Sequence, residues 1–177
     1  IRQMYNIATA RVCITDSYSI PISVLKHKKN LKVVQIWHSM GAIKQFGYQC
    51  IGKKSGRNPI VSKSLKMHNN YDLIFSGSEA MISYYSKAFN YDKKYFAVNN
   101  LPRMDYIINN KGNLELKNQI ADMYPGIFDK ETILYAPTFR GNIYQGFSML
   151  PFDGEKLIIS FDENTYLIYK LHPLLKN

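Results

Sequence analysis

Short apolar runs recur along the chain, and each is followed directly by small or polar residues. The clearest is LKVVQI at residues 31–36, which is apolar enough to be buried on both faces of a parallel sheet. Ser78 then opens a helix whose apolar residues recur at every fourth position. Strand–helix–strand units of this length predict right-handed parallel crossovers, and therefore an α/β fold. The expected strands are residues 11–15, 31–37, 71–75, 95–98, 132–136 and 166–171.

The character of the sequence changes near residue 109. Residues 109–130 are polar and helical up to a Pro-Gly stop, and a new strand follows them. We expect one α/β domain over residues 1–108, a connector over 109–130, and the beginning of a second domain over 131–177. A domain of two strands has an incomplete core, so we expect the chain to be a fragment of a longer protein. The alternative is a single domain with an irregular end.

The formal net charge of the 177-residue chain is +10, which favours an anionic partner. The basic residues occur in small groups, and ordinary solvated faces explain them equally well. We find no zinc-type Cys/His spacing and no helix-turn-helix pattern, so we do not expect nucleic acid as the partner. No apolar run approaches the ~18 residues of a membrane span. Two cysteines make no disulfide framework in a chain of this length, which favours a reducing, cytoplasmic setting.

Ligands of open parallel sheets bind beyond the carboxyl ends of the strands. Arginine side chains, backbone N–H groups and helix N-termini at such ends suit a phosphate-bearing ligand. The chain has no GxGxxG, Walker or GxSxG motif, which disfavours dinucleotide binding, P-loop hydrolysis and α/β-hydrolase chemistry. The residues expected at the strand ends are Asp16, Ser17, His38, Ser39, Ser76, Ser78, Arg103, Arg140 and His172.

His38 is the sharpest candidate, because an imidazole exchanges protons near neutral pH and can act as a base on a hydroxyl. The alternative is a structural histidine that bonds a backbone carbonyl. His172 also stands at a strand end, where capping of the strand is the simpler role. Arg140 suits a phosphate, although an ordinary surface arginine is equally compatible. His27 and His68 lie in polar, lysine-rich surroundings, and we expect both at the surface.

Five motifs, in this order, resemble the CDP-glycerol glycerophosphotransferase family, the polymerases and primases of wall teichoic acid and related polymers. Each is weak alone, but together they span residues 34–173. The motifs are VQIWHSMGAIKQFG (34–47), YDLIFSGSEAM (71–81), NLPRMDYI (100–107), ILYAPTFRG (133–141) and YKLHP (169–173).

The resemblance implies a GT-B architecture of two Rossmann-like domains, with the acceptor side in residues 1–108 and the start of the donor domain in 131–177. It implies transfer of glycerol phosphate or ribitol phosphate from CDP-glycerol or CDP-ribitol to a polyprenyl-linked polyol-phosphate acceptor, with release of CMP. The enzyme would work peripherally at the cytoplasmic face of the membrane, on an anionic surface. We expect no metal and no cofactor. The alternatives are a GT-B glycosyltransferase that uses a nucleotide sugar and a non-enzymatic basic module.

By resemblance, His38 is the general base on the acceptor hydroxyl, and His172 contacts the donor pyrophosphate and stabilises the leaving CMP. Arg140 matches the arginine of an APT-x-R motif beside the donor phosphates. Two departures stand out: Ser39 replaces a glycine that is frequent in the family, and the family's Ser/Asp-rich donor segment would lie beyond Asn177. The other residues expected to bind substrate are Thr138, Arg103, Asp105, Lys44, Ser78 and Lys170.

Overall fold

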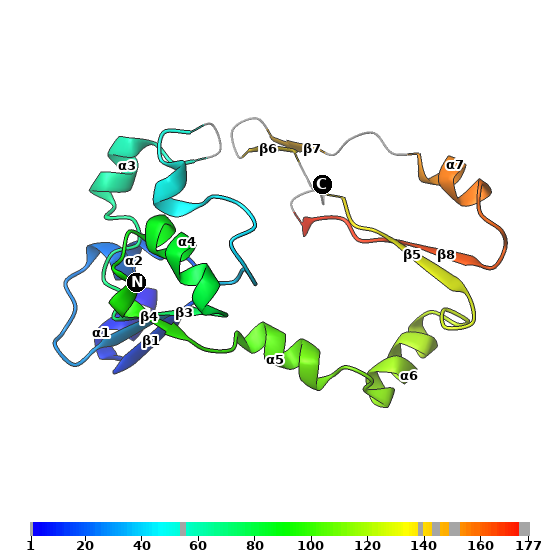
Figure 1. The fold of residues 1–177 in the computed structure, drawn as a ribbon, viewed down its shortest axis with the longest axis horizontal. Coiled ribbons are helices and arrows are strands. Elements are labelled where there is room, and N and C mark those ends of the chain that lie inside the picture. Colours follow the sequence, from blue (N-terminus) through cyan, green and yellow to red (C-terminus); the bar gives the residue numbers. More distant parts are fainter. Residues whose placement is uncertain (1, 54–55, 138–139, 143–145, 149–152, 174–177) are drawn as a thin grey trace. The chain divides into compact units, whose positions relative to one another are not determined.

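The computed structural model describes residues 2–53, 56–137, 140–142, 146–148 and 153–173 (Figure 1). The chain divides into two compact units, residues 1–109 and 110–177. The elements of the first unit are α1 (Arg2–Thr9), β1 (Val12–Thr15), α2 (Ile20–Val24), β2 (Lys32–Gln35), η1 (Gly47–Cys50), α3 (Pro59–Ser64), β3 (Leu73–Ser76), α4 (Glu79–Phe89), η2 (Lys93–Tyr95), β4 (Phe96–Val98) and α5 (Pro102–Asn109). Those of the second are α6 (Leu114–Met123), β5 (Glu131–Tyr135), β6 (Arg140–Asn142), β7 (Gly146–Ser148), α7 (Gly154–Ile159) and β8 (Thr165–Tyr169).

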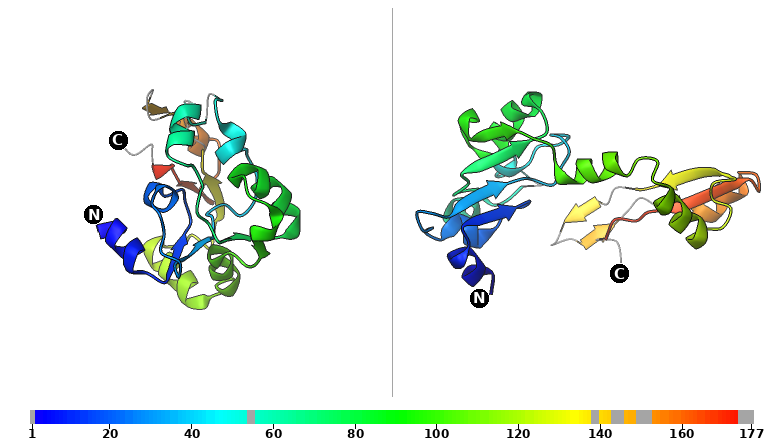
Figure 2. Two further views of the ribbon diagram at one scale, coloured as in Figure 1. Left: turned by 90° about the vertical axis from the view of Figure 1, so that its left-hand side faces the viewer. Right: turned by 90° about the horizontal axis from the view of Figure 1, so that it is seen from below.

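The first unit is built on a parallel four-stranded sheet of order β1-β2-β3-β4. Figure 2 shows these strands side by side, with helices packed around them. The Asp72 carboxylate ties β2 to the start of β3, because it accepts the Val33 N–H at 2.8 Å and pairs with the Lys32 ammonium at 3.1 Å. The parallel α/β fold predicted from the alternating runs is therefore present.

Helix α4 covers the sheet with the apolar face that the sequence predicted. Tyr85 and Phe89 are buried against Val33 and Ile74 of the sheet, and Met81 packs at the edge of the same core. Burial of a large aromatic side chain contributes a few kcal/mol, so this face fixes α4 on the sheet. Ser78 occupies the N-cap position as expected, but its side chain makes no capping hydrogen bond.

One expectation about the end of a strand was wrong. The strand predicted to reach Trp37 ends at Gln35, because Trp37 adopts a left-handed backbone with φ of 55° and its N–H bonds the Gln35 side chain in place of a neighbouring strand. After β4, Pro102 begins helix α5. Proline is well suited to a first helical turn, since its missing N–H would have no partner there.

The second unit pairs β5 with β8 in parallel, from Glu131 opposite Thr165 to Tyr135 opposite Tyr169. Strands β6 and β7 form a separate antiparallel hairpin. The polar residues expected to be a helical connector form α6, which begins at an Asn113 cap and ends before Pro125. The Asn113 side chain accepts the backbone N–H groups of two residues in the first turn.

Candidate functional site

His38 lies in the loop after β2 and is exposed to solvent. Its Nδ1 atom is 2.8 Å from the backbone carbonyl oxygen of Asp16, which follows the neighbouring strand β1. A carbonyl oxygen only accepts hydrogen bonds, so Nδ1 carries a proton, and in the neutral ring the lone pair is on Nε2. The carbonyl bond expected of a structural histidine is thus present, and it leaves Nε2 as the basic atom.

Trp37 explains the pairing of tryptophan and histidine at this strand end. Its indole stacks on Phe46, with centroids 4.4 Å apart and an interplanar angle of 18°, and meets Phe89 of α4 edge-to-face at 5.2 Å. The His38 ring is a further neighbour of the indole, with centroids 4.1 Å apart. The left-handed turn at Trp37 therefore places the indole against the core and His38 outside it.

Residues 39–47 form a loop that returns to α4. The Tyr85 hydroxyl donates to the Ser39 carbonyl at 3.2 Å, and the Ala42 N–H lies 3.4 Å from the Met81 sulfur. Gly47 closes the loop with φ of +56°, where an added Cβ would lie 2.2 Å from the Ala88 carbonyl oxygen. The loop is held at both ends by α4, and Lys44 projects from it as an exposed side chain.

Three more predicted residues follow strands of the same sheet. Ser78 is half-buried after β3, and its carbonyl accepts the Ser76 hydroxyl at 2.7 Å. Arg103, which is exposed, and Asp105, which is half-buried, lie in the first turn of α5 after β4. Because the strands are parallel, these residues and His38 all lie beyond the same edge of the sheet.

The second unit carries the remaining predicted residues. Lys170, which is exposed, and His172, which is half-buried, follow β8. The Lys170 N–H bonds the Tyr135 carbonyl at 3.0 Å, so the segments that follow β5 and β8 begin at one edge of this sheet. Arg140 lies in β6. Thr138 lies outside the described residues.

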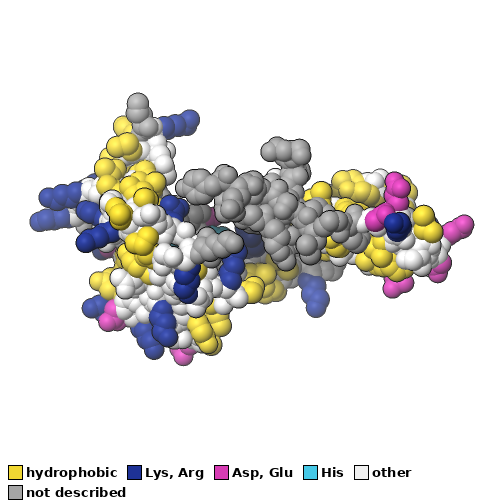
Figure 3. Space-filling view, turned by 90° about the horizontal axis from the view of Figure 1, so that it is seen from above, with side chains coloured by type: hydrophobic (Ala, Val, Ile, Leu, Met, Phe, Trp, Pro, Cys, Tyr) yellow, Lys and Arg dark blue, Asp and Glu magenta, His cyan; other side chains and the backbone are white. Residues whose placement is uncertain are grey.

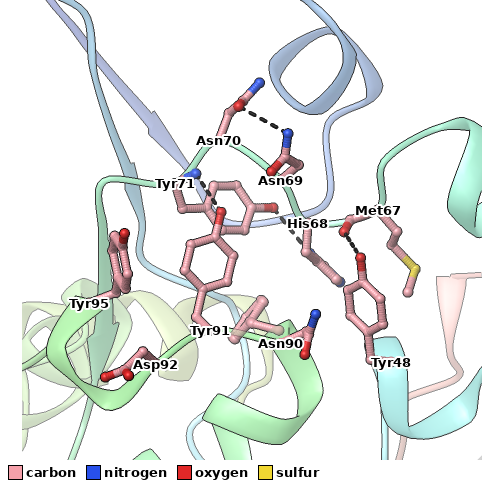
Figure 4. A pocket seen from close by; sticks show the side chains of 11 residues that line it. Tyr48, Met67, His68, Asn69, Asn70, Tyr71, Asn90, Tyr91, Asp92 and Tyr95 are labelled. Atoms are coloured by element: carbon pink, nitrogen blue, oxygen red, sulfur yellow. Dashed lines mark hydrogen bonds between the residues drawn. The ribbon is translucent and has the colours of Figure 1, made fainter.

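A polar pocket of about 410 Å³ lies at the opposite edge of the first sheet, before β3 and β4 (Figure 4). Its hydroxyl groups are largely used within the protein: Tyr91 accepts the Tyr71 N–H at 2.8 Å, and Tyr48 donates to the Met67 carbonyl at 2.9 Å. The residues that line it are Tyr48, Met67, His68, Asn69, Asn70, Tyr71, Phe89, Asn90, Tyr91, Asp92 and Tyr95.

His68 was predicted at the surface, and this prediction was wrong. The side chain is only 4% exposed, because its ring is surrounded edge-on by Trp37, Tyr18 and Phe89. Its Nδ1 atom is 3.1 Å from the Tyr71 hydroxyl. Burial, and secondarily the Arg57 charge, lowers the pKa of His68 to about 4, so the ring is neutral at pH 7. The surrounding lysines had suggested exposure, but the aromatic neighbours come from distant parts of the sequence.

This burial predicts that the protein becomes less stable in mild acid. The folded pKa of His68 lies below the ordinary value of 6.5, so its contribution is complete above pH 6.5 and is lost as the pH falls toward 4. Urea unfolding at pH 7.5 and pH 5 should show a loss of about 2 kcal/mol from this residue. Asparagine tolerates the left-handed backbone at this position (φ 59°). Between the two pH values, a His68→Asn variant should lose about 2 kcal/mol less unfolding free energy than the wild type. Equal losses in both proteins would contradict the assignment.

Lys and Arg side chains (dark blue) are spread over the visible face of the first unit, with few acidic groups among them (Figure 3). Among the residues that the structure describes, no three His, Cys, Asp or Glu side chains gather as metal ligands would. Within the same ranges, every helix is too short or too polar to cross a bilayer.

A family of known proteins matches the whole chain. The family model described as CDP-Glycerol:Poly(glycerophosphate) glycerophosphotransferase matches residues 1–177. The chain is 33% identical over 177 residues to a teichoic acid poly(ribitol-phosphate) polymerase of Bacillus spizizenii, covering 98% of this chain and 28% of that protein. It is also 33% identical to a teichoic acid glycerol-phosphate primase of Bacillus subtilis, covering 100% of this chain and 45% of the primase.

The fold is similar to that of the wall teichoic acid polymerase TagF. A TagF variant structure soaked with CDPG superposes with a TM-score of 0.73 at 19% identity, covering 93% of this chain and 41% of that one. The α/β, GT-B-like fold class predicted from the sequence is confirmed by this match. The chain spans less than half the length of the relatives it matches.

Proposed function

The chain belongs to the CDP-glycerol:poly(glycerophosphate) glycerophosphotransferase family, and on that premise we propose that it is part of an enzyme that transfers a polyol phosphate from a CDP-polyol. The acceptor is the terminal hydroxyl of a polyprenyl-linked polyol-phosphate chain, and the second product is CMP. Relatives named for glycerol phosphate and for ribitol phosphate both support this class of donor. The CDP-polyol is the substrate of the proposed reaction, which requires no cofactor.

The observation that carries the proposal is the geometry of His38. Its Nδ1 atom is bound to the Asp16 carbonyl, which leaves the Nε2 lone pair on an exposed ring beyond the carboxyl edge of the sheet. In the proposed step, Nε2 accepts the proton of the acceptor hydroxyl while the hydroxyl oxygen forms a bond to the phosphorus that carries the polyol. The bond from that phosphorus to the bridging oxygen breaks, and CMP leaves with the electron pair.

The donor side of the reaction needs positive charge around the pyrophosphate. We assign this role to His172, Arg140 and Lys170, with Thr138 in the same motif as Arg140. The parallel pairing of β5 and β8 supports the grouping, because the segments that carry His172 and Arg140 both begin at one edge of that sheet. Arg103, Asp105, Lys44 and Ser78 are assigned to substrate contacts on the first unit.

The proposed partner surface is the anionic cytoplasmic leaflet of the cell membrane, with peripheral attachment. A net charge of +10 and the basic face of the first unit support this partner. Each Lys or Arg near such a surface contributes about 1 kcal/mol of attraction. Sedimentation with phosphatidylserine-containing vesicles at low salt should carry the full-length protein down, and equal binding to neutral vesicles would contradict the attachment.

A donor panel tests the function. The full-length protein, with a lipid-linked acceptor, should release CMP from CDP-glycerol or CDP-ribitol and no UDP from UDP-hexoses. Release of UDP alone would identify a GT-B glycosyltransferase instead. Absence of nucleotide release, together with salt-dependent binding of unrelated polyanions, would identify a non-enzymatic basic module.

A further inference from the structure

We infer that Gln35 is a positioning residue, which sets the orientation of His38 through the two loops that hold it. Gln35 is the last residue of β2, and its polar side chain is fully buried. A buried amide must find hydrogen-bond partners for its donor and acceptor groups, so those partners show which segments of the chain it holds in place. The role in catalysis rests on the proposed function, whereas the role in orienting the ring does not.

The amide of Gln35 joins the loops that follow β1 and β2. Its Oε1 atom accepts the Trp37 N–H at 2.8 Å, and its Nε2 atom donates to the Ser17 carbonyl at 3.2 Å. Trp37 immediately precedes His38, and Ser17 immediately follows Asp16, whose carbonyl holds the His38 ring. Gln35 therefore fixes the residue beside each end of the His38–Asp16 hydrogen bond.

The conformation of Trp37 requires such support. A tryptophan with φ of 55° is unfavourable, because its Cβ crowds the backbone in the left-handed region. The hydrogen bond from the Trp37 N–H to Gln35 holds that conformation from within the sheet. The Gln35 amide also hydrogen-bonds the Tyr71 hydroxyl, which is within hydrogen-bond distance of Nδ1 of His68. The amide therefore belongs to a buried polar network.

The test compares Gln35→Met, which keeps the size of the side chain and removes all of its hydrogen bonds, with the wild-type full-length protein. We expect kcat for CMP release to fall by about 10- to 100-fold, with KM for the CDP-polyol unchanged, because the base and not the donor site is misplaced. The ¹⁵N spectrum of the His38 ring should change from a single Nδ1–H tautomer to a mixture. Gln35→Glu, which keeps the acceptor but in ionised form cannot donate to Ser17, should change both readouts in the same direction.

Tyr91→Phe is the matched control, since it removes a half-buried hydrogen-bond partner of the Tyr71 N–H at the other edge of the same sheet. It should lower stability while kcat and the His38 spectrum stay as in the wild type. Unchanged kcat in both Gln35 variants, or an equal loss in Tyr91→Phe, would overturn the positioning role. If the wild type releases no CMP, the proposed function fails by itself, and an unchanged His38 spectrum in the Gln35 variants would separately overturn this inference.

Discussion

Replacing His38 with alanine is expected to lower kcat for CMP release by about 10²- to 10⁴-fold, the usual contribution of a general base. The substitution removes the Nε2 lone pair that the Asp16 carbonyl keeps available. Because the ring is exposed and lies outside the core, the fold should be retained. The measurement is CMP release by the full-length protein at saturating CDP-polyol and acceptor, with the far-UV circular dichroism of the variant recorded in parallel.

His27→Ala is the matched control for this experiment. His27 is a half-buried histidine in the connection before β2, at the edge of the sheet opposite to His38. Its replacement should leave kcat within about twofold, because the side chain lies at the edge of the sheet away from the proposed site. A His38→Ala protein that is folded and retains wild-type turnover would refute the role of His38 as base.

Replacing Gly47 with alanine should destabilise the protein by about 3 kcal/mol or more. The residue has φ of +56°, and a Cβ would lie 2.2 Å from the Ala88 carbonyl oxygen and 3.3 Å from His68 Cδ2. The strain of a left-handed alanine and the displacement of α4 add together. Urea unfolding followed by fluorescence of Trp37, the single tryptophan of the chain, measures the loss.

Gly52→Ala separates the two causes. Gly52 has φ of +74°, but an added Cβ meets nothing closer than Pro59 Cγ at 3.6 Å. This variant should lose only about 1 kcal/mol, the cost of the backbone conformation alone. If Gly47→Ala is no less stable than Gly52→Ala, the close approach of the loop to α4 is not the reason for a glycine at residue 47.

Much of the first unit could be predicted because its strands are encoded locally. Runs such as LKVVQI and the four-residue spacing of Met81, Tyr85 and Phe89 mark buried strands and a helix without reference to the rest of the chain. Parallel strands then place their carboxyl ends at one edge, which is why His38, Ser78 and Arg103 could be expected near that edge.

What escaped prediction depends on contacts between distant residues. At the left-handed turn, Trp37 bonds the Gln35 amide, which also bonds the Ser17 carbonyl, and it stacks on Phe46; a strand pattern reveals none of these contacts. The burial of His68 likewise depends on aromatic rings from other elements. One signal was available: Gln35 is a polar residue at a position that the pattern of β2 assigns to the core.

The most direct test of the proposed polyol-phosphate transfer follows the phosphorus atom. The full-length protein would be given CDP-glycerol, or CDP-ribitol if that is its donor, with ³²P in the phosphate that carries the polyol. Attack of the acceptor hydroxyl on that phosphorus predicts ³²P in the lipid-linked acceptor and unlabelled CMP, one for each polyol phosphate added. Recovery of the ³²P in released CDP, with the polyol transferred without its phosphate, would contradict attack of the acceptor hydroxyl on that phosphorus.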